Sequence, residues 1–194
     1  MGGVTFQILL AASAIKIAHR TVNTFGSGNS GAVSLGTATS DRLIVVVVVG
    51  GQHPTSLSIS GVGFTQIGSV AKVGIWSAQM GTSFGTSGTI SLGGTAGGQA
   101  WMVYSVYNAK PSAFAVVGNG VLNIPKNGVC IGGACSLNPG TPIGWTGLTV
   151  DVEQALFGVT RISTASKEFT AAQTPLSNGA SGGAPDQVEA SWGP

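Results

Sequence analysis

The most constraining feature of this chain is a run of apolar residues, Leu43 and Ile44 followed by five consecutive valines from Val45 to Val49. Side chains branched at Cβ favour extended backbone, so the run predicts a β-strand. Neighbouring side chains of a strand point to opposite faces, so both faces of this strand are apolar and both must be covered. We therefore expect it in mid-sheet, with an opposing sheet on one face and loops or a neighbouring subunit on the other. At a sheet edge it would promote aggregation.

The rest of the chain also resembles a series of short strands, because 32 glycines interrupt almost every window in which a helix could form. Turn sequences rich in Gly and Asn separate the segments. We expect strands at residues 5–10, 16–24, 31–35, 42–49, 55–60, 64–70, 72–79, 89–92, 100–107, 114–118, 128–137, 146–152, 157–163, 167–170 and 187–191.

This pattern over 194 residues predicts a single all-β domain, a jelly-roll-like antiparallel β-sandwich. The sandwich is expected to span residues 26–194, after N-terminal strands or a docking arm in residues 1–25. Residues 171–186 have the composition of a long surface loop before a closing strand. Trp192 is expected to anchor that strand, because an exposed indole would forgo a large burial term.

Charged residues are scarce, with 8 Lys and Arg against 6 Asp and Glu. The basic residues do not cluster, which argues against the basic patch that nucleic-acid binding needs. A surface with few charges suits a protein that packs against neighbours. The apolar run at residues 4–15 follows no basic residue and is too short to span a bilayer, so we expect neither a signal peptide nor membrane insertion.

Two cysteines, Cys130 and Cys135, lie in one predicted strand. Positions five apart on a strand point to opposite faces and lie about 16 Å apart, beyond the reach of a disulfide. A tight hairpin at Gly132 and Gly133 would bring them together instead. Buried, reduced thiols are the favoured interpretation.

Asp151 and Glu153 form one close carboxylate pair. Two positions apart on a strand they share a face, so they could hold a hard cation such as calcium with loop carbonyls. The favoured alternative is that Val150 and Val152 point inward while both acids meet solvent.

The two histidines, His19 and His53, have no catalytic motif around them. We interpret them as incidental. We therefore expect no catalytic residue, no cofactor and no metal ion, and predict that the protein is not an enzyme.

Aromatic residues are the better candidates for a binding surface. Five of them could form a platform for a sugar ring or a partner protein: Trp76, Trp101, Tyr104, Tyr107 and Trp145. Their two-residue periodicity among aliphatic neighbours is equally what a sandwich core predicts, and for most of them the core is favoured.

Several segments resemble the jelly-roll-like β-sandwich domains of virion proteins from tailed bacteriophages. They are the valine strand preceded by Ser40-Asp41, the segment Gly61-Val62-Gly63-Phe64, the strand end Tyr104-Ser105-Val106-Tyr107-Asn108, and the stretch from Trp145 to Glu153. The resemblance covers roughly residues 30–194, and its motifs are structural.

This resemblance implies a structural component of the virion, assembled in the host cytoplasm. We expect a capsid decoration (cement) protein that stabilises the head. The alternative is a receptor- or carbohydrate-binding domain of a tail or head fibre, with a host surface glycan as ligand. The expected partners are other copies of the chain, as a trimer because capsid lattices offer three-fold sites, and the major capsid or other virion proteins.

Overall fold

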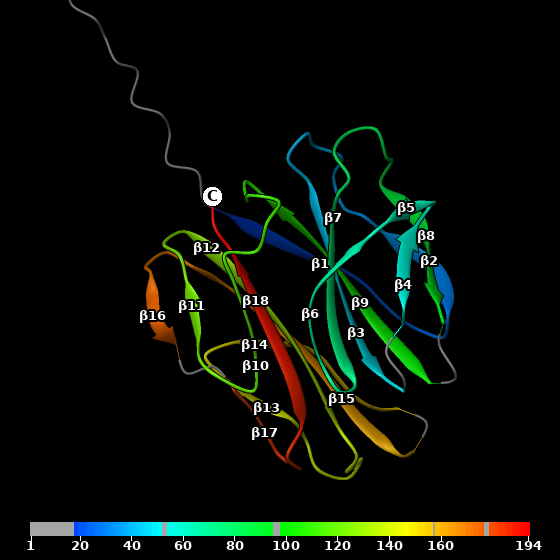
Figure 1. Ribbon diagram of the computed structural model, residues 1–194, viewed down its shortest axis with the longest axis vertical. Coiled ribbons are helices and arrows are strands. Elements are labelled where there is room, and N and C mark those ends of the chain that lie inside the picture. The colour runs from blue at the N-terminus through cyan, green and yellow to red at the C-terminus, as the bar shows by residue number, and fades with distance from the viewer. Residues whose placement is uncertain (1–17, 52–53, 95–97, 157, 177–178) are drawn as a thin grey trace, which may run out of the picture.

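The computed structural model describes residues 18–51, 54–94, 98–156, 158–176 and 179–194. Within these ranges the chain is all-β, with 18 strands and no helix (Figure 1). No helix in this part of the chain could therefore cross a membrane. The predicted class of an antiparallel β-sandwich is confirmed, whereas jelly-roll connectivity stays a prediction.

Three sheets carry most of the strands. The central sheet has the order β1 (His19–Ser27), β9 (Gln99–Tyr107), β3 (Leu43–Gly50), β7 (Val73–Gln79), β6 (Thr65–Val70). The C-terminal sheet has the order β10 (Ala115–Gly118), β18 (Asp186–Trp192), β12 (Gly128–Ser136), β15 (Thr160–Phe169), β14 (Thr149–Leu156). The cover sheet has the order β2 (Ser30–Ser34), β8 (Ser87–Gly93), β4 (Ser56–Ile59), β5 (Val62–Gly63). Two small pairs join β11 (Leu122–Ile124) to β16 (Gln173–Leu176) and β13 (Gly144–Thr146) to β17 (Gly179–Ser181).

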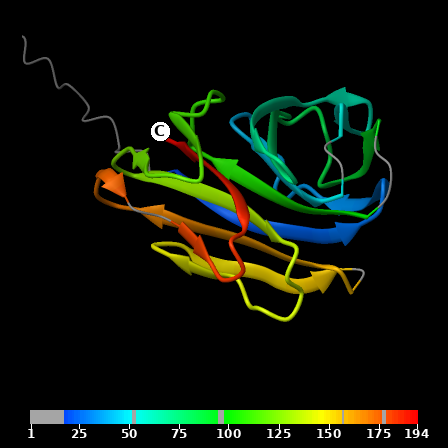
Figure 2. The same cartoon turned by 60° about the horizontal axis from the view of Figure 1, so that its bottom comes forward.

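The sheets are stacked in layers, with the central sheet between the other two (Figure 2). Strands β1 to β9 supply the whole of the central and cover sheets, and strands β10 to β18 supply everything else. The two halves of the chain thus meet where the central sheet packs on the C-terminal sheet. The small strand pairs contribute to a further apolar cluster on the outer face of the C-terminal sheet.

The valine strand is β3, and it lies mid-sheet between β9 and β7, as predicted. Val45, Val47 and Val49 pack toward the C-terminal sheet, whereas Ile44, Val46 and Val48 pack toward the cover sheet. The expectation that loops or a neighbouring subunit would cover the second face is wrong, because the chain's own cover sheet does so. Each valine buried in this way contributes about 1.5–3 kcal/mol of transfer free energy.

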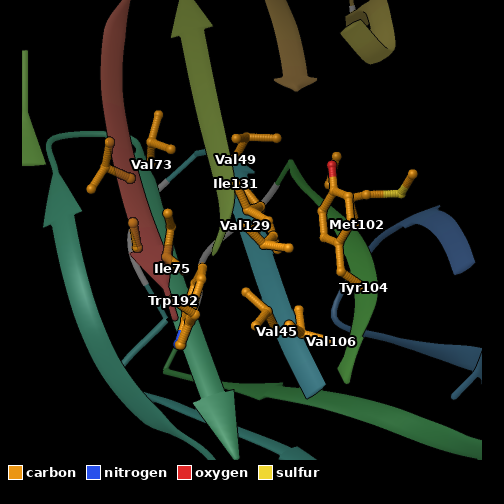
Figure 3. Packing of buried hydrophobic residues seen from close by; sticks show 14 of the residues in the cluster. Val45, Val49, Val73, Ile75, Met102, Tyr104, Val106, Val129, Ile131 and Trp192 are labelled. Carbon is orange, nitrogen blue, oxygen red and sulfur yellow. The ribbon is translucent and has the colours of Figure 1, made fainter. Parts of the chain in front are cut away.

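The core between the central and C-terminal sheets is tightly closed (Figure 3). Ile75 and Val47 of the central sheet meet Ile131 and Trp192 of the opposing one, and Trp192 is fully buried, as predicted. At Gly133 the sheets approach so closely that a Cβ atom would lie 2.4 Å from Val47 Cγ1. This position therefore requires glycine.

Most predicted strands are present, with shifted boundaries. The segments expected at 157–163 and 167–170 form one strand, β15, and the segment expected at 146–152 is divided between β13 and β14. The stretch 171–186, expected as a loop, contains β16 and β17. The strand predicted at 5–10 lies outside the described residues. The boundary expected after residue 25 falls inside β1, which pairs with β9 at the edge of the central sheet.

Candidate functional site

The five aromatic residues predicted as a binding platform do not share a surface. Trp76 and Trp101 are buried between the central and cover sheets, and Tyr104 is buried on the other side of the central sheet. Trp145 lies half-buried over the outer face of the C-terminal sheet, where its Nε1 donates a hydrogen bond to Ser163 Oγ at 2.9 Å.

Tyr107, the fifth of these residues, lies at the end of β9 and is also buried. Its ring stacks on that of His19, with centroids 4.9 Å apart and an interplanar angle of 20°. His53, the other histidine, lies outside the described residues. The structure thus brings one predicted aromatic residue together with one histidine.

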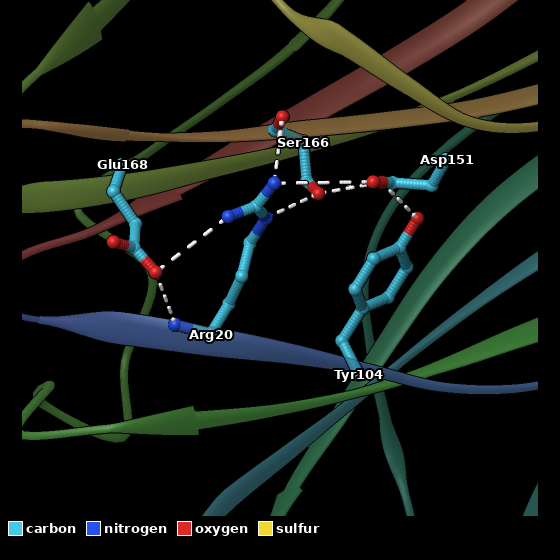
Figure 4. Close-up of polar contacts among 5 residues, drawn as sticks. All are labelled: Arg20, Tyr104, Asp151, Ser166 and Glu168. Atoms are coloured by element: carbon cyan, nitrogen blue, oxygen red, sulfur yellow. Dashed lines mark hydrogen bonds and ion pairs between the residues drawn. The ribbon is translucent and has the colours of Figure 1, made fainter.

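A charged network joins the two halves of the chain between β1, β9, β14 and β15 (Figure 4). Its centre is Asp151, whose Oδ2 accepts hydrogen bonds from Tyr104 Oη at 2.8 Å and Ser166 Oγ at 2.5 Å. Arg20 forms an ion pair with Asp151 at 3.8 Å and donates from Nη2 to the Ser166 carbonyl at 3.2 Å. Its Nε also donates to Ser166 Oγ. Glu168 closes the network by accepting from the Arg20 backbone N–H at 2.8 Å.

A β-bulge between Val150 and Val152 sets this arrangement. A bulge adds one residue to a strand and changes which side chains face inward. Val150 is consequently 43% exposed, while the side chain of Asp151 is only 6% exposed. The expectation that Val150 points inward and Asp151 meets solvent is wrong for this reason.

Glu153, the other member of the predicted pair, has different partners. Its Oε1 accepts from the Ile143 backbone N–H at 2.7 Å and from Arg161 Nε at 3.0 Å. Asp151 and Glu153 therefore do not converge on a common cation. Among the described residues, no three His, Cys, Asp or Glu side chains gather into a possible metal site.

The electrostatics of the network follow from its burial. Desolvation raises the pKa of the Asp151 carboxyl, and the hydrogen bonds from Ser166 and Tyr104 and the charge of Arg20 oppose that effect. Burial, together with the charge of Asp151, raises the pKa of Tyr104 well above its ordinary value. Tyr104 therefore stays neutral and donates. Ser166 is fully buried, so it presents no nucleophile, and Asp151 and Ser166 join the C-terminal sheet to the central sheet through Tyr104 and Arg20.

The two cysteines are free and buried on opposite faces of β12, as predicted. Burial raises the pKa of Cys130 well above its usual range, and the charge of Glu189 acts in the same direction. Glu189 lies on the neighbouring strand β18 and is itself fully buried. Neither thiol has the lowered pKa of a reactive cysteine.

Arg42 is one of the basic residues that do not cluster in the sequence. It is fully buried where the cover sheet meets the central sheet. Its guanidinium donates to five backbone carbonyls, those of Leu35, Gly36, Gly81, Phe84 and Gly85. Burial lowers its pKa from the ordinary value. This arginine binds two loops of the first half of the chain.

Sequence reasoning missed Arg20 and Ser166 as partners of Asp151, and Glu168 as a partner of Arg20. They are separated by up to 148 residues along the chain, and no spacing signals such a contact. Comparison with protein-family models, curated proteins and solved structures gives no match, so the resemblance to virion proteins stays a prediction from its motifs.

Proposed function

We propose that this chain is a structural virion protein of a tailed bacteriophage, a capsid decoration protein that stabilises the head by packing against copies of itself and against capsid subunits. It acts by binding and transforms no substrate. The resemblance set out above supplies the family, and the distribution of charge in the fold is the observation that carries the proposal.

Most of the few carboxylates make contacts within the fold. Asp41, Asp151, Glu153 and Glu168 each accept a hydrogen bond from elsewhere in the fold, and Glu189 is fully buried. With 8 Lys and Arg and 6 Asp and Glu in 194 residues, the surface carries few charges of either sign to repel a neighbour. Such a surface supports close packing in an assembly.

Exposed apolar side chains offer contacts for that packing. Leu137 is 66% exposed and Val159 is 63% exposed. Ser136 pairs with Arg161, so both side chains lie at the same end of the C-terminal sheet. We place the contact between copies at this end, because two large apolar side chains that face water together favour association.

Light scattering after size exclusion, with binding to purified heads of the encoding phage, tests the proposal. We expect a trimer that binds heads. A variant with Leu137→Asp and Val159→Asp should become monomeric with an unchanged melting temperature, whereas Thr89→Asp, at an exposed position on the cover sheet, should remain trimeric. A wild-type protein that is monomeric and does not bind heads would overturn the proposal.

A further inference from the structure

A hollow of about 430 Å³ opens at the end of β1 and β9, beside the loop that leads into β3. It is lined by His19, Thr21, Thr37, Thr39, Asp41, Tyr107 and Asn108. On β1, His19 and Thr21 alternate with Arg20, which points to the charged network around Asp151. The hollow is therefore separate from that network, and its volume lies within the range of small-molecule sites.

One wall of the hollow is aromatic, and its rings are fixed by stacking and by a hydrogen bond. The exposed imidazole of His19 stacks on the buried ring of Tyr107, and Tyr107 Oη donates to the Thr37 carbonyl at 3.2 Å. These contacts restrict the orientation of both rings. The outer face of the imidazole thus offers a flat surface for a ligand. Because the His19 side chain is already restricted, binding there costs less side-chain conformational entropy.

The remaining lining is polar, and a hydrogen bond from the backbone orients its carboxylate. Asp41 Oδ2 accepts from the Asn108 backbone N–H at 2.6 Å, and Asn108 adopts a left-handed conformation with φ of 55°. Asn108 Nδ2 lies 3.5 Å from His19 Nδ1. The hydroxyl of Thr39 is buried and has no hydrogen-bond partner among the described residues. Buried hydroxyls usually have a partner, so the Thr39 hydroxyl has hydrogen-bonding capacity that a rotation of its side chain would offer to a ligand.

We propose that this hollow binds a neutral sugar residue. The C–H face of a pyranose ring would lie against the His19 imidazole, and the sugar hydroxyls would donate to Asp41 and exchange hydrogen bonds with Asn108 and the threonines. A carboxylate has about four lone-pair sites, so Asp41 can accept from a ligand while it holds the Asn108 N–H.

The lining argues against an anionic ligand. None of its residues is Lys or Arg, the side chains that phosphate and carboxylate groups select, and Asp41 would repel such groups.

Saturation-transfer NMR and calorimetry test the proposal with a panel of neutral mono- and oligosaccharides and, for comparison, sialylated and phosphorylated sugars. We expect at least one neutral sugar to bind the full chain. His19→Ala should weaken binding by about ten-fold or more, because it removes the stacking surface. Asn108→Gly keeps the left-handed backbone and should also weaken binding. Thr170→Ala, exposed after β15, is the matched control and should leave binding unchanged.

Failure of every neutral sugar to bind, or binding that neither variant weakens, would overturn the proposal. Binding confined to sialylated or phosphorylated sugars would also overturn it. The proposed virion role is tested separately, because the Leu137 and Val159 variant should keep the sugar site, and His19→Ala should still bind heads.

Discussion

The two halves of the chain bury the apolar faces of their sheets in different ways. Strands β1 to β9 make two sheets with a core of their own, whereas the inner face of the C-terminal sheet is covered only by the central sheet of the first half. Their buried polar contacts also differ in how far apart the partners lie in the sequence. Arg42 binds carbonyls within 43 residues of itself, while the network around Asp151 joins residues up to 148 positions apart.

The first half thus has an apolar core of its own, whereas the second half buries the inner face of its sheet against the first half. Loop closure over longer separations costs more entropy, and such contacts form later in folding. The central sheet contributes to the cores of both halves. Substitutions on its two faces should therefore destabilise different neighbouring sheets.

The largest expected effect is at Arg42. Arg42→Ala should lower the free energy of unfolding by about 3–5 kcal/mol, because carbonyls of two loops lose a charged donor. Urea denaturation measures the loss. Arg42→Lys should lose less than alanine, since lysine keeps the charge but not the planar fork. Equal stability of Arg42→Ala and wild type would show that the loops hold without this side chain.

Substitutions on the two faces of β3 test whether these faces belong to separate cores. Val46→Ala and Val47→Ala should each cost about 2 kcal/mol, from lost burial and a residual cavity. Amide hydrogen exchange should separate them, because Val47 packs toward the C-terminal sheet and Val46 toward the cover sheet. We expect Val47→Ala to speed exchange in β12 and Val46→Ala to leave it unchanged. The same acceleration in both variants would contradict the assignment of faces.

A smaller effect is expected at Asp151. Asp151→Ala should cost about 1–2 kcal/mol at neutral pH, because the buried hydroxyls of Tyr104 and Ser166 lose their acceptor. Asp151→Asn keeps a carbonyl oxygen and should cost less. Urea denaturation of both variants would show it, and equal losses would indicate that the two hydroxyls find other acceptors.

The pH dependence of the same carboxyl has a defined sign. Its pKa in the folded protein is raised above the ordinary 3.8, so the stabilisation from this group is complete below that pH and is lost as the pH rises through the folded value. Wild type should therefore lose stability relative to Asp151→Asn as the pH increases from 3.8 toward neutrality. A relative gain over that interval would show that Arg20 outweighs desolvation.

Much of the apolar framework could be predicted from the sequence. The valine strand is central, the two cysteines lie on opposite faces of one strand, and Trp192 is buried, because strand periodicity and burial decide each of these. The polar sites could not be predicted. The bulge at Val150 reverses the expected alternation, and Arg20 meets Ser166 only through the pairing of whole sheets.

The same limit applies to the aromatic residues. Periodicity could not tell which of them would reach the surface, because that depends on what covers each face of β7, β9 and β13. Tyr107 lines a hollow at the end of β9 next to β1.

One chain covers both faces of its valine strand, so its outer surface remains available for partners. Amide hydrogen exchange of β3 across a dilution series of the wild-type protein tests this most directly. We expect the same strong protection at every concentration, including where the oligomer has dissociated. Protection that falls on dilution would contradict it, because a neighbouring subunit would then be needed to cover the strand.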